Sequence, residues 1–181
     1  ESSREEVLNV TFINQKSTIN VEKMKEDFAS YINLDTEKYQ IFMDGSMTFS
    51  LDDSADYQSN MATQVQLIGL TQSNDLDIII TDKTTFDHLA GQEFFVDIET
   101  YLPQELLEKI NPSFYRNSIS RQDGSGEITY SGLLINDSPL YKGIQLKDDM
   151  VLGVLVNTKH QDNILRFLEF FYNYSFDTAS K

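Results

Sequence analysis

One stretch, residues 76–86, constrains the fold of this chain more than any other. It contains three consecutive β-branched apolar residues at positions 78–80, a run that is typical of a short strand buried on both faces. The polar residues 81–83 then end the strand, and Thr84 with Asp87 fits the capping box of a following helix. A buried strand that leads into a capped helix is half of a βαβ unit, so the stretch predicts an α/β fold.

The composition is that of a globular chain. Its 181 residues, of which 40% are hydrophobic, are enough for one core but few for two, so we expect a single domain over residues 1–181. The net charge of −15 disfavours nucleic acid and anionic membranes as direct partners, because both are negatively charged. The chain has no cysteine, which excludes disulfides and thiol chemistry, and it carries no cofactor or metal motif, so neither group is expected.

The first ninety residues alternate between strand and helix patterns. Strands are predicted at residues 7–13, 39–49 and 78–80, each followed by a helix. The crossovers are long enough to join parallel strands, so we expect an open, mostly parallel sheet with helices on both faces. In the second helix, apolar residues at helical spacing predict a stripe that faces the core. This stripe consists of Tyr57, Met61, Val65 and Ile68.

The pattern loosens over roughly residues 92–150, which we interpret as a small helical and hairpin insertion. Residues 116–126 are predicted to be a polar segment that ends in a turn, and a strand is predicted at residues 127–135. A second buried strand is predicted at residues 151–156, where Gly153 indicates a close approach by a neighbouring backbone. The last helix is expected to pack its apolar residues against the sheet. These residues are Ile164, Phe167, Leu168 and Phe171.

Ligands of open α/β sheets bind beyond the carboxyl ends of the strands. The first candidate site is therefore the turn at residues 81–84. The alternative interpretation is that these residues only end a strand and start a helix. Asp82 and His88 are the candidates for a catalytic base, but no pattern brings a second catalytic group to either of them. We prefer to interpret His88 as an exposed helix residue, and the chain is not expected to be an enzyme.

The order of the motifs is similar to that of a known family. Residues 74–82 (NDLDIIITD) precede Phe86 and Leu89 and then residues 95–102 (FVDIETYL). This segment resembles a strand, helix and short turn of the extracellular solute-binding proteins of ABC importers. The run at residues 150–158 (MVLGVLVNT) and the helix after it are similar to the strand and helix that return to the first lobe in that family. The resemblance implies a type II periplasmic-binding-protein-like fold, shortened to a single lobe.

The resemblance also implies where a ligand would bind. It places the site at the strand ends, where Asp82 and Asn157 are expected to converge. Members of the family have two lobes that close on a ligand, whereas residues 92–150 are too few for a second lobe. The candidate ligand-binding residues are Asn14, Gln15, Thr81, Asp82, Thr84, Asn157 and Thr158, with Tyr130 and Tyr141 lining the site from the insertion.

The function implied by the resemblance is that of a non-catalytic, extracytoplasmic domain that binds a small molecule or a peptide. We expect it to be held at the cell surface by an anchor outside this chain, and to meet either its ligand or a membrane-protein partner. One alternative is a degenerate lobe that acts as a protein-interaction or sensing module, exposing an apolar patch around Phe94, Phe95, Phe114 and Tyr115. A second alternative is a hydrolase-type enzyme that uses Asp82 or His88.

Overall fold

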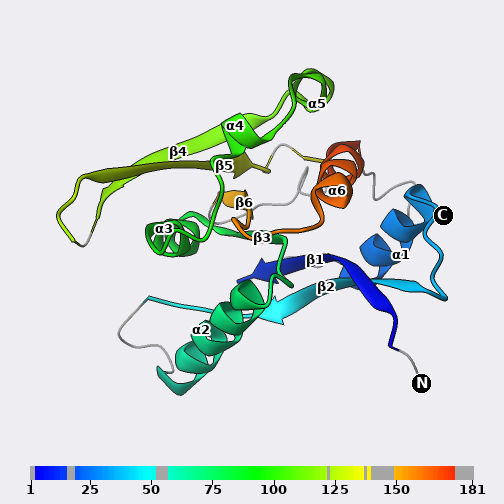
Figure 1. Ribbon diagram of the computed structural model, residues 1–181, viewed down its shortest axis with the longest axis horizontal. Coiled ribbons are helices and arrows are strands. Elements are labelled where there is room, and N and C mark those ends of the chain that lie inside the picture. Colours follow the sequence, from blue (N-terminus) through cyan, green and yellow to red (C-terminus); the bar gives the residue numbers. More distant parts are fainter. Residues whose placement is uncertain are drawn as a thin grey trace.

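The computed structural model describes residues 3–15, 19–51, 57–121, 123–136, 138–139 and 149–173. These residues form a six-stranded sheet in the order β2-β1-β3-β6-β5-β4 (Figure 1). The strands are β1 (Glu5–Ile13), β2 (Tyr39–Met47), β3 (Ile78–Asp82), β4 (Ser113–Ser120), β5 (Glu127–Leu134) and β6 (Met150–Val154). The helices are α1 (Val21–Tyr31), α2 (Tyr57–Gln72), α3 (Lys83–Gly91), α4 (Ile98–Tyr101), α5 (Gln104–Ile110) and α6 (Gln161–Asn173).

The sheet is mixed, which confirms the α/β class but limits the expectation of parallel strands to one end. β1 pairs in parallel with both β2 and β3, as the long crossovers predicted. β6 pairs antiparallel with β3 and with β5, and β5 pairs antiparallel with β4. The direction of β6 depends on which end of the sheet the chain reaches before β6 begins. The hydrophobic periodicity of the sequence does not indicate which end that is.

Helices cover both faces of the sheet, as expected. The three isoleucines of β3 are fully buried, and they divide between two apolar clusters because successive side chains point to opposite faces. Ile78 and Ile80 pack in the cluster that contains α1, α5 and α6, whereas Ile79 packs in the cluster that contains α2 and α3. Burying each of these side chains contributes about 1.5–3 kcal/mol, so β3 is the centre of the fold.

Aromatic rings join α6 to α1 across one face. Phe167 of α6 meets Phe28 of α1 edge to face, with ring centroids 5.3 Å apart, and both side chains are fully buried. Phe171 packs 5.6 Å from Phe167 on the same helix. The predicted inward face of the last helix is therefore confirmed, and α6 is held against the parallel end of the sheet.

Gly153 lies in the middle of β6 at the place where two phenylalanine rings meet the sheet. The rings of Phe86 and Phe95 stack with centroids 4.6 Å apart. A Cβ atom on Gly153 would lie 2.6 Å from Phe95 Cδ1 and 2.8 Å from Phe86 Cε2. The predicted close approach is present, but the approaching groups are these side chains rather than a backbone.

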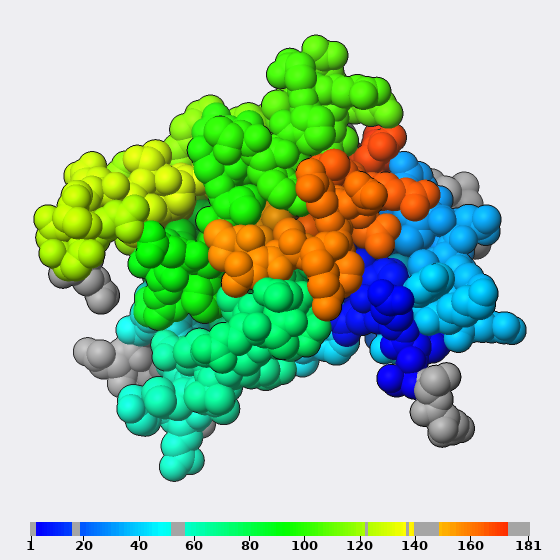
Figure 2. All heavy atoms as spheres, viewed as in Figure 1, coloured from blue at the N-terminus to red at the C-terminus, as the bar shows by residue number. Residues whose placement is uncertain are grey.

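The apolar stripe predicted for α2 points outward, which corrects the expected orientation of this helix. Tyr57 is 74% exposed and Val65 is 64% exposed, and Met61 and Ile68 are exposed as well. The side chains that α2 buries are Thr63 and Leu67. Apolar residues occur on both sides of α2, so their spacing does not determine which side faces the core. Figure 2 shows α2 on the lower surface, bordered by other described segments but not covered by them.

β4 forms the first strand of the hairpin expected in this insertion, but the sequence did not indicate its bounds. Its residues were expected to be polar and irregular beyond position 116, yet the strand continues to Ser120 in register with β5. The predicted turn is present, and Arg121 N donates to Gly126 O across it at 2.7 Å. The hairpin extends the main sheet, and half-buried and exposed side chains alternate from Tyr115 to Ser120, with the polar Asn117 on the half-buried face.

Candidate functional site

The candidate residues at the strand ends fall at two opposite ends of the sheet. β6 is antiparallel to β3, so Asp82 lies opposite Met150 while Ile78 lies opposite Val154. Asn157 follows β6 and therefore lies beyond the Ile78 end of β3. Four residues of strand span roughly 13 Å, so Asp82 and Asn157 do not converge. The expectation of one shared site was wrong, because it assumed that the carboxyl ends of these strands share an edge.

At one end, Asn14, Thr81 and Asp82 do come together. Asn14 follows β1 with a backbone φ of 61°, which turns its side chain between β2 and α3. Its Nδ2 atom donates to Asp82 Oδ1 at 2.8 Å and to Phe49 O at 2.7 Å, and Phe49 N donates back to Asn14 Oδ1 at 2.9 Å. Thr81 Oγ1 also donates to Asp82 Oδ1, at 3.2 Å.

Asp82 itself is the N-cap of α3, a role that the sequence analysis had given to Thr84. Asp82 Oδ2 accepts from Thr85 N at 3.1 Å, and Oδ1 accepts from Thr85 Oγ1 at 2.9 Å. Burial would raise the pKa of Asp82, but the hydrogen bonds from Asn14 and Thr85 outweigh it and lower the pKa below 3.8. Both carboxylate oxygens are thus occupied by the chain itself, which is the behaviour of a structural cap.

Replacing Asp82 by alanine is expected to destabilise the fold by about 1–2 kcal/mol at pH 7, the usual cost of losing an N-cap. Because the folded-state pKa is lowered, this contribution is present above the unfolded-state value of 3.8 and is lost as the pH falls through the folded-state pKa. The difference between the two chains should therefore shrink below about pH 4. Urea unfolding at pH 7 and pH 3 measures it, and an unchanged difference would contradict the cap assignment.

The other candidate residues are spread over the surface and the core. Thr84 and Asn157 are exposed, and Gln15 is half-buried after β1. Tyr130 is buried in β5, where its hydroxyl donates to Asp87 Oδ1 at 3.0 Å, and burial is the main reason why its pKa is raised. Tyr141 lies outside the described residues. The candidate residues that the structure describes do not surround one pocket.

His88 is half-buried, which corrects its interpretation as an exposed residue. Its ring stacks on Phe49 with centroids 5.3 Å apart, and burial lowers its pKa. Among the described residues, its Nε2 atom is buried and has no hydrogen-bond partner. Asp82 lies six residues earlier, at the other end of α3, which corresponds to roughly 9 Å along the helix. The two candidate bases therefore do not form a pair.

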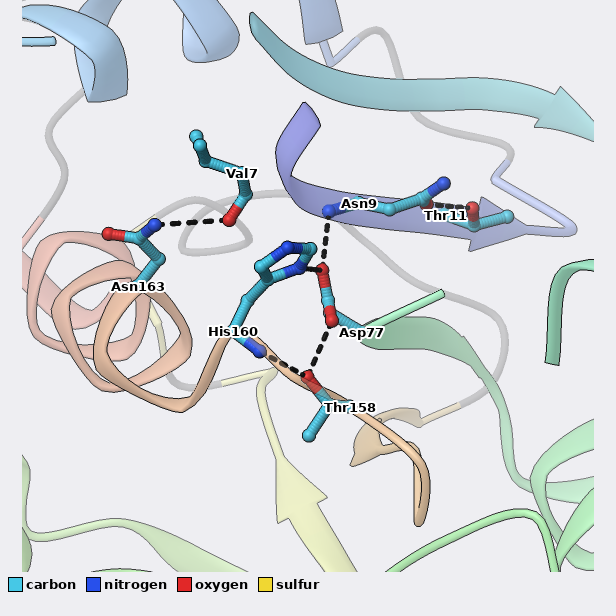
Figure 3. A network of polar contacts seen from close by, with 7 residues as sticks. All are labelled: Val7, Asn9, Thr11, Asp77, Thr158, His160 and Asn163. Atoms are coloured by element: carbon cyan, nitrogen blue, oxygen red, sulfur yellow. Dashed lines mark hydrogen bonds and ion pairs between the residues drawn. The ribbon is translucent and has the colours of Figure 1, made fainter. Parts of the chain in front are cut away.

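A buried polar network that the sequence did not predict surrounds Asp77 (Figure 3). Asp77 precedes β3 and is 0% exposed. Its Oδ2 atom accepts from Asn9 N at 2.8 Å and from His160 Nδ1 at 2.8 Å, and its Oδ1 accepts from Thr158 Oγ1 at 2.5 Å. A carboxylate between Leu76 and Ile78 in a buried run was the signal for such a network, because a buried charge needs partners.

This network joins three segments that are distant in the sequence. Asn9 belongs to β1, whereas Thr158 and His160 follow β6, and His160 N donates to Thr158 Oγ1 at 3.1 Å just before α6 begins. The side chain of His160 is only 12% exposed. The three donors satisfy the Asp77 carboxylate and fix the end of β6 against β1, so we assign the network a structural role.

A cleft of about 740 Å³ lies between α1 and β2. One face of α1 lines it at spacings of three and four residues, with Glu22, Lys25, Glu26, Ala29 and Ser30. All of residues 39–43 line it from β2. Glu6 of β1, which pairs with Gln40, also lines the cleft, so the cleft extends from the start of β1 along β2. Among the described strands, β2 pairs only with β1, so its outer edge is unpaired within that part of the chain.

The charged side chains that line the cleft differ in whether they have an ion-pair or hydrogen-bond partner. Lys25 Nζ lies 2.9 Å from Glu22 Oε2, and Arg4 Nη1 donates to Thr36 O at 2.9 Å. Glu6 differs, because its Oε1 atom is buried and has no hydrogen-bond partner among the described residues. Gln40 Nε2 closes one end of the cleft by donating to Arg4 O at 3.0 Å. The cleft thus contains a carboxylate oxygen that can still accept a donor.

Comparisons with known proteins return no relatives. No family model matches the chain, and no curated protein and no solved structure shows significant similarity to it. No helix within the described ranges combines the length and the apolar character that crossing a membrane requires. In the same part of the chain, no three His, Asp or Glu side chains are placed to hold a metal ion.

Proposed function

We propose that this chain is a non-catalytic binding domain of the solute-binding-protein type, which takes a small molecule or an extended peptide in the cleft between α1 and β2. The observation that carries the proposal is the cleft itself. Its volume of about 740 Å³ is typical of ligand sites, which occupy roughly 300–1,000 Å³. It contains polar groups of both signs beside Ile41 and Met43, a combination that orients a ligand and also buries part of it.

The relationship to solute-binding proteins is part of this proposal, and the path of the chain supports it. After β3 and α3 the chain makes an excursion over residues 92–149, and β6 and α6 then return beside β3 and against α1. In the family, a strand and a helix return to the first lobe in the same order. The relationship implies an extracytoplasmic location and a membrane-protein partner.

The excursion explains why the ligand site would lie at the sheet edge. β4 and β5 continue the main sheet on the far side of β6, so the described residues contain no second lobe to close over the strand ends. The open edge of β2 offers a different mode of binding. An extended peptide can add to a sheet edge through main-chain hydrogen bonds, while neighbouring pockets select its side chains. The face of α1 beside β2 would supply those pockets.

A pair of single-tryptophan variants tests the site. The chain has no tryptophan, so Phe42→Trp places the only one beside the cleft, and Tyr57→Trp places the only one on α2. Titration with a set of synthetic hexapeptides is expected to shift the emission of Phe42→Trp in a saturable way and to leave Tyr57→Trp unchanged. No response of Phe42→Trp to any hexapeptide would contradict binding in the cleft.

A second candidate function is interaction with a second copy of this chain through α2. The helix has sixteen residues, none of them charged, although the whole chain carries a net charge of −15. Two such chains repel one another unless they meet through an uncharged surface, and the exposed stripe of α2 is one. The patch expected around Phe94, Phe95, Phe114 and Tyr115 is not available, because these side chains are buried or half-buried.

The same pair of variants distinguishes this second candidate. If α2 mediates self-association, the emission of Tyr57→Trp shifts with protein concentration in the absence of any peptide, and the shift grows with salt because salt screens the repulsion. Phe42→Trp should then show no dependence on concentration. An emission of Tyr57→Trp that is constant from micromolar to millimolar protein would rule this candidate out.

A further inference from the structure

We infer that the cleft between α1 and β2 selects a ligand that carries a primary ammonium group, and that Glu6, which lines the cleft, binds this group. The inference rests on the proposed function of the cleft and names the chemical class of its ligand. A lysine side chain of an extended peptide fits this class, and the open edge of β2 favours a peptide as its source.

The first observation is the state of the Glu6 carboxylate. The side chain lines the cleft and is half-buried, yet its Oε1 atom is shielded from water and has no hydrogen-bond donor among the described residues. A buried acceptor without a donor is costly, and such groups in native proteins call for an explanation. A ligand that brings N–H donors into the cleft supplies what the chain does not.

The second observation is the charge around Glu6. Burial raises the pKa of Glu6, and a side-chain hydrogen bond with Asn9 opposes it as the next largest effect. The nearby carboxylates of Asp75 and Asp77 raise the pKa further, and His160 lowers it. Nδ1 of His160 is already committed to Asp77 at 2.8 Å. The region behind Glu6 is therefore rich in negative charge, which attracts a cation and repels an anion.

The third observation is that the two cations which line the cleft are engaged elsewhere. Lys25 pairs with Glu22, and Arg4 donates to Thr36 O. Neither forms a hydrogen bond or an ion pair with Glu6 in the described part of the chain, and Glu26 adds another carboxylate to the lining. An ammonium group fits this setting because it carries three donors and a compact positive charge.

The test compares matched hexapeptides that differ at one side chain. One contains lysine and the other contains acetyl-lysine at the same position, with both termini blocked. Isothermal titration of the unmodified chain is expected to give an affinity for the lysine peptide at least tenfold higher. In Glu6→Gln this preference should fall below twofold, while binding of the acetyl-lysine peptide is retained. Glu5→Gln is the control, because it removes the same charge from the neighbouring, exposed residue. This variant should keep the preference for the lysine peptide.

The outcomes separate the two levels of the proposal. If neither peptide binds, the proposed function of the cleft fails. If both bind equally, or if Glu6→Gln keeps the preference, the cleft binds peptides but the assignment of Glu6 is overturned. Cadaverine is included as a free small amine. If it binds as tightly as the lysine peptide, the ammonium group that the cleft selects comes from a small amine rather than from a peptide. The melting temperature of Glu6→Gln checks that the variant is folded.

Discussion

Replacing Asp77 by alanine is expected to destabilise the folded chain by about 3–5 kcal/mol, enough to unfold much of a marginally stable domain. The carboxylate is 0% exposed and accepts three hydrogen bonds, from Asn9 N, Thr158 Oγ1 and His160 Nδ1. Its removal leaves these donors buried without an acceptor, and each such loss costs about 1–3 kcal/mol. Urea unfolding at pH 7, followed by far-UV circular dichroism, measures the change.

A neighbouring carboxylate provides the control for this prediction. Asp75→Ala removes the same charge two residues earlier, but among the described residues the Asp75 side chain accepts only an exposed bond from Ser73 Oγ at 2.6 Å. We expect a loss within about 0.5 kcal/mol, as for an ordinary surface substitution. Equal effects of Asp75→Ala and Asp77→Ala would show that the network around Asp77 does not stabilise the fold.

Replacing Gly153 by valine is expected to cost more than about 3 kcal/mol, because the added side chain overpacks the stacked rings of Phe86 and Phe95. Even the Cβ atom of the new side chain would lie 2.6 Å from Phe95 Cδ1, and Cβ atoms in proteins essentially never make contacts this short. Both rings are buried and sit between the sheet and α3, so neither can move without displacing its neighbours. Thermal unfolding of the variant measures the effect.

A second glycine gives the matched control. Gly69 lies in α2, and a Cβ atom added there would meet nothing within 4 Å. Gly69→Ala is expected to stabilise the chain by about 0.5–1 kcal/mol, since alanine loses less conformational entropy in a helix. Gly153→Ala should be destabilising. The explanation by ring contacts fails if the two alanine variants change the melting temperature in the same direction.

The sequence was sufficient for the elements that are decided locally. The isoleucines at positions 78–80 predicted a doubly covered strand, and the structure buries all three completely. The aromatic face of α6 was predicted equally well, because a wide apolar stripe leaves one way to pack. In both cases the spacing of apolar residues along the element is enough to predict which side chains are buried, and the order of the strands in the sheet does not have to be known.

The features that the sequence did not predict depend on contacts between distant segments. The direction of β6 separates Asp82 from Asn157, and no property of either residue encodes it. The outward stripe of α2 arises because both sides of that helix are apolar. The cleft requires α1 to lie beside an open edge of β2, which follows from the order of the strands. The candidate site predicted from strand ends was therefore replaced by one at the sheet edge.

Hydrogen exchange of the backbone amides, with and without the lysine hexapeptide, tests the central claim most directly. If an extended ligand adds to the edge of β2, exchange should slow at residues 39–43 and in the adjoining face of α1, with no change in α2 or at residues 81–85. Protection at residues 81–85 would return the site to the strand end. Protection confined to α2, or none anywhere, would contradict a ligand site at the edge of β2.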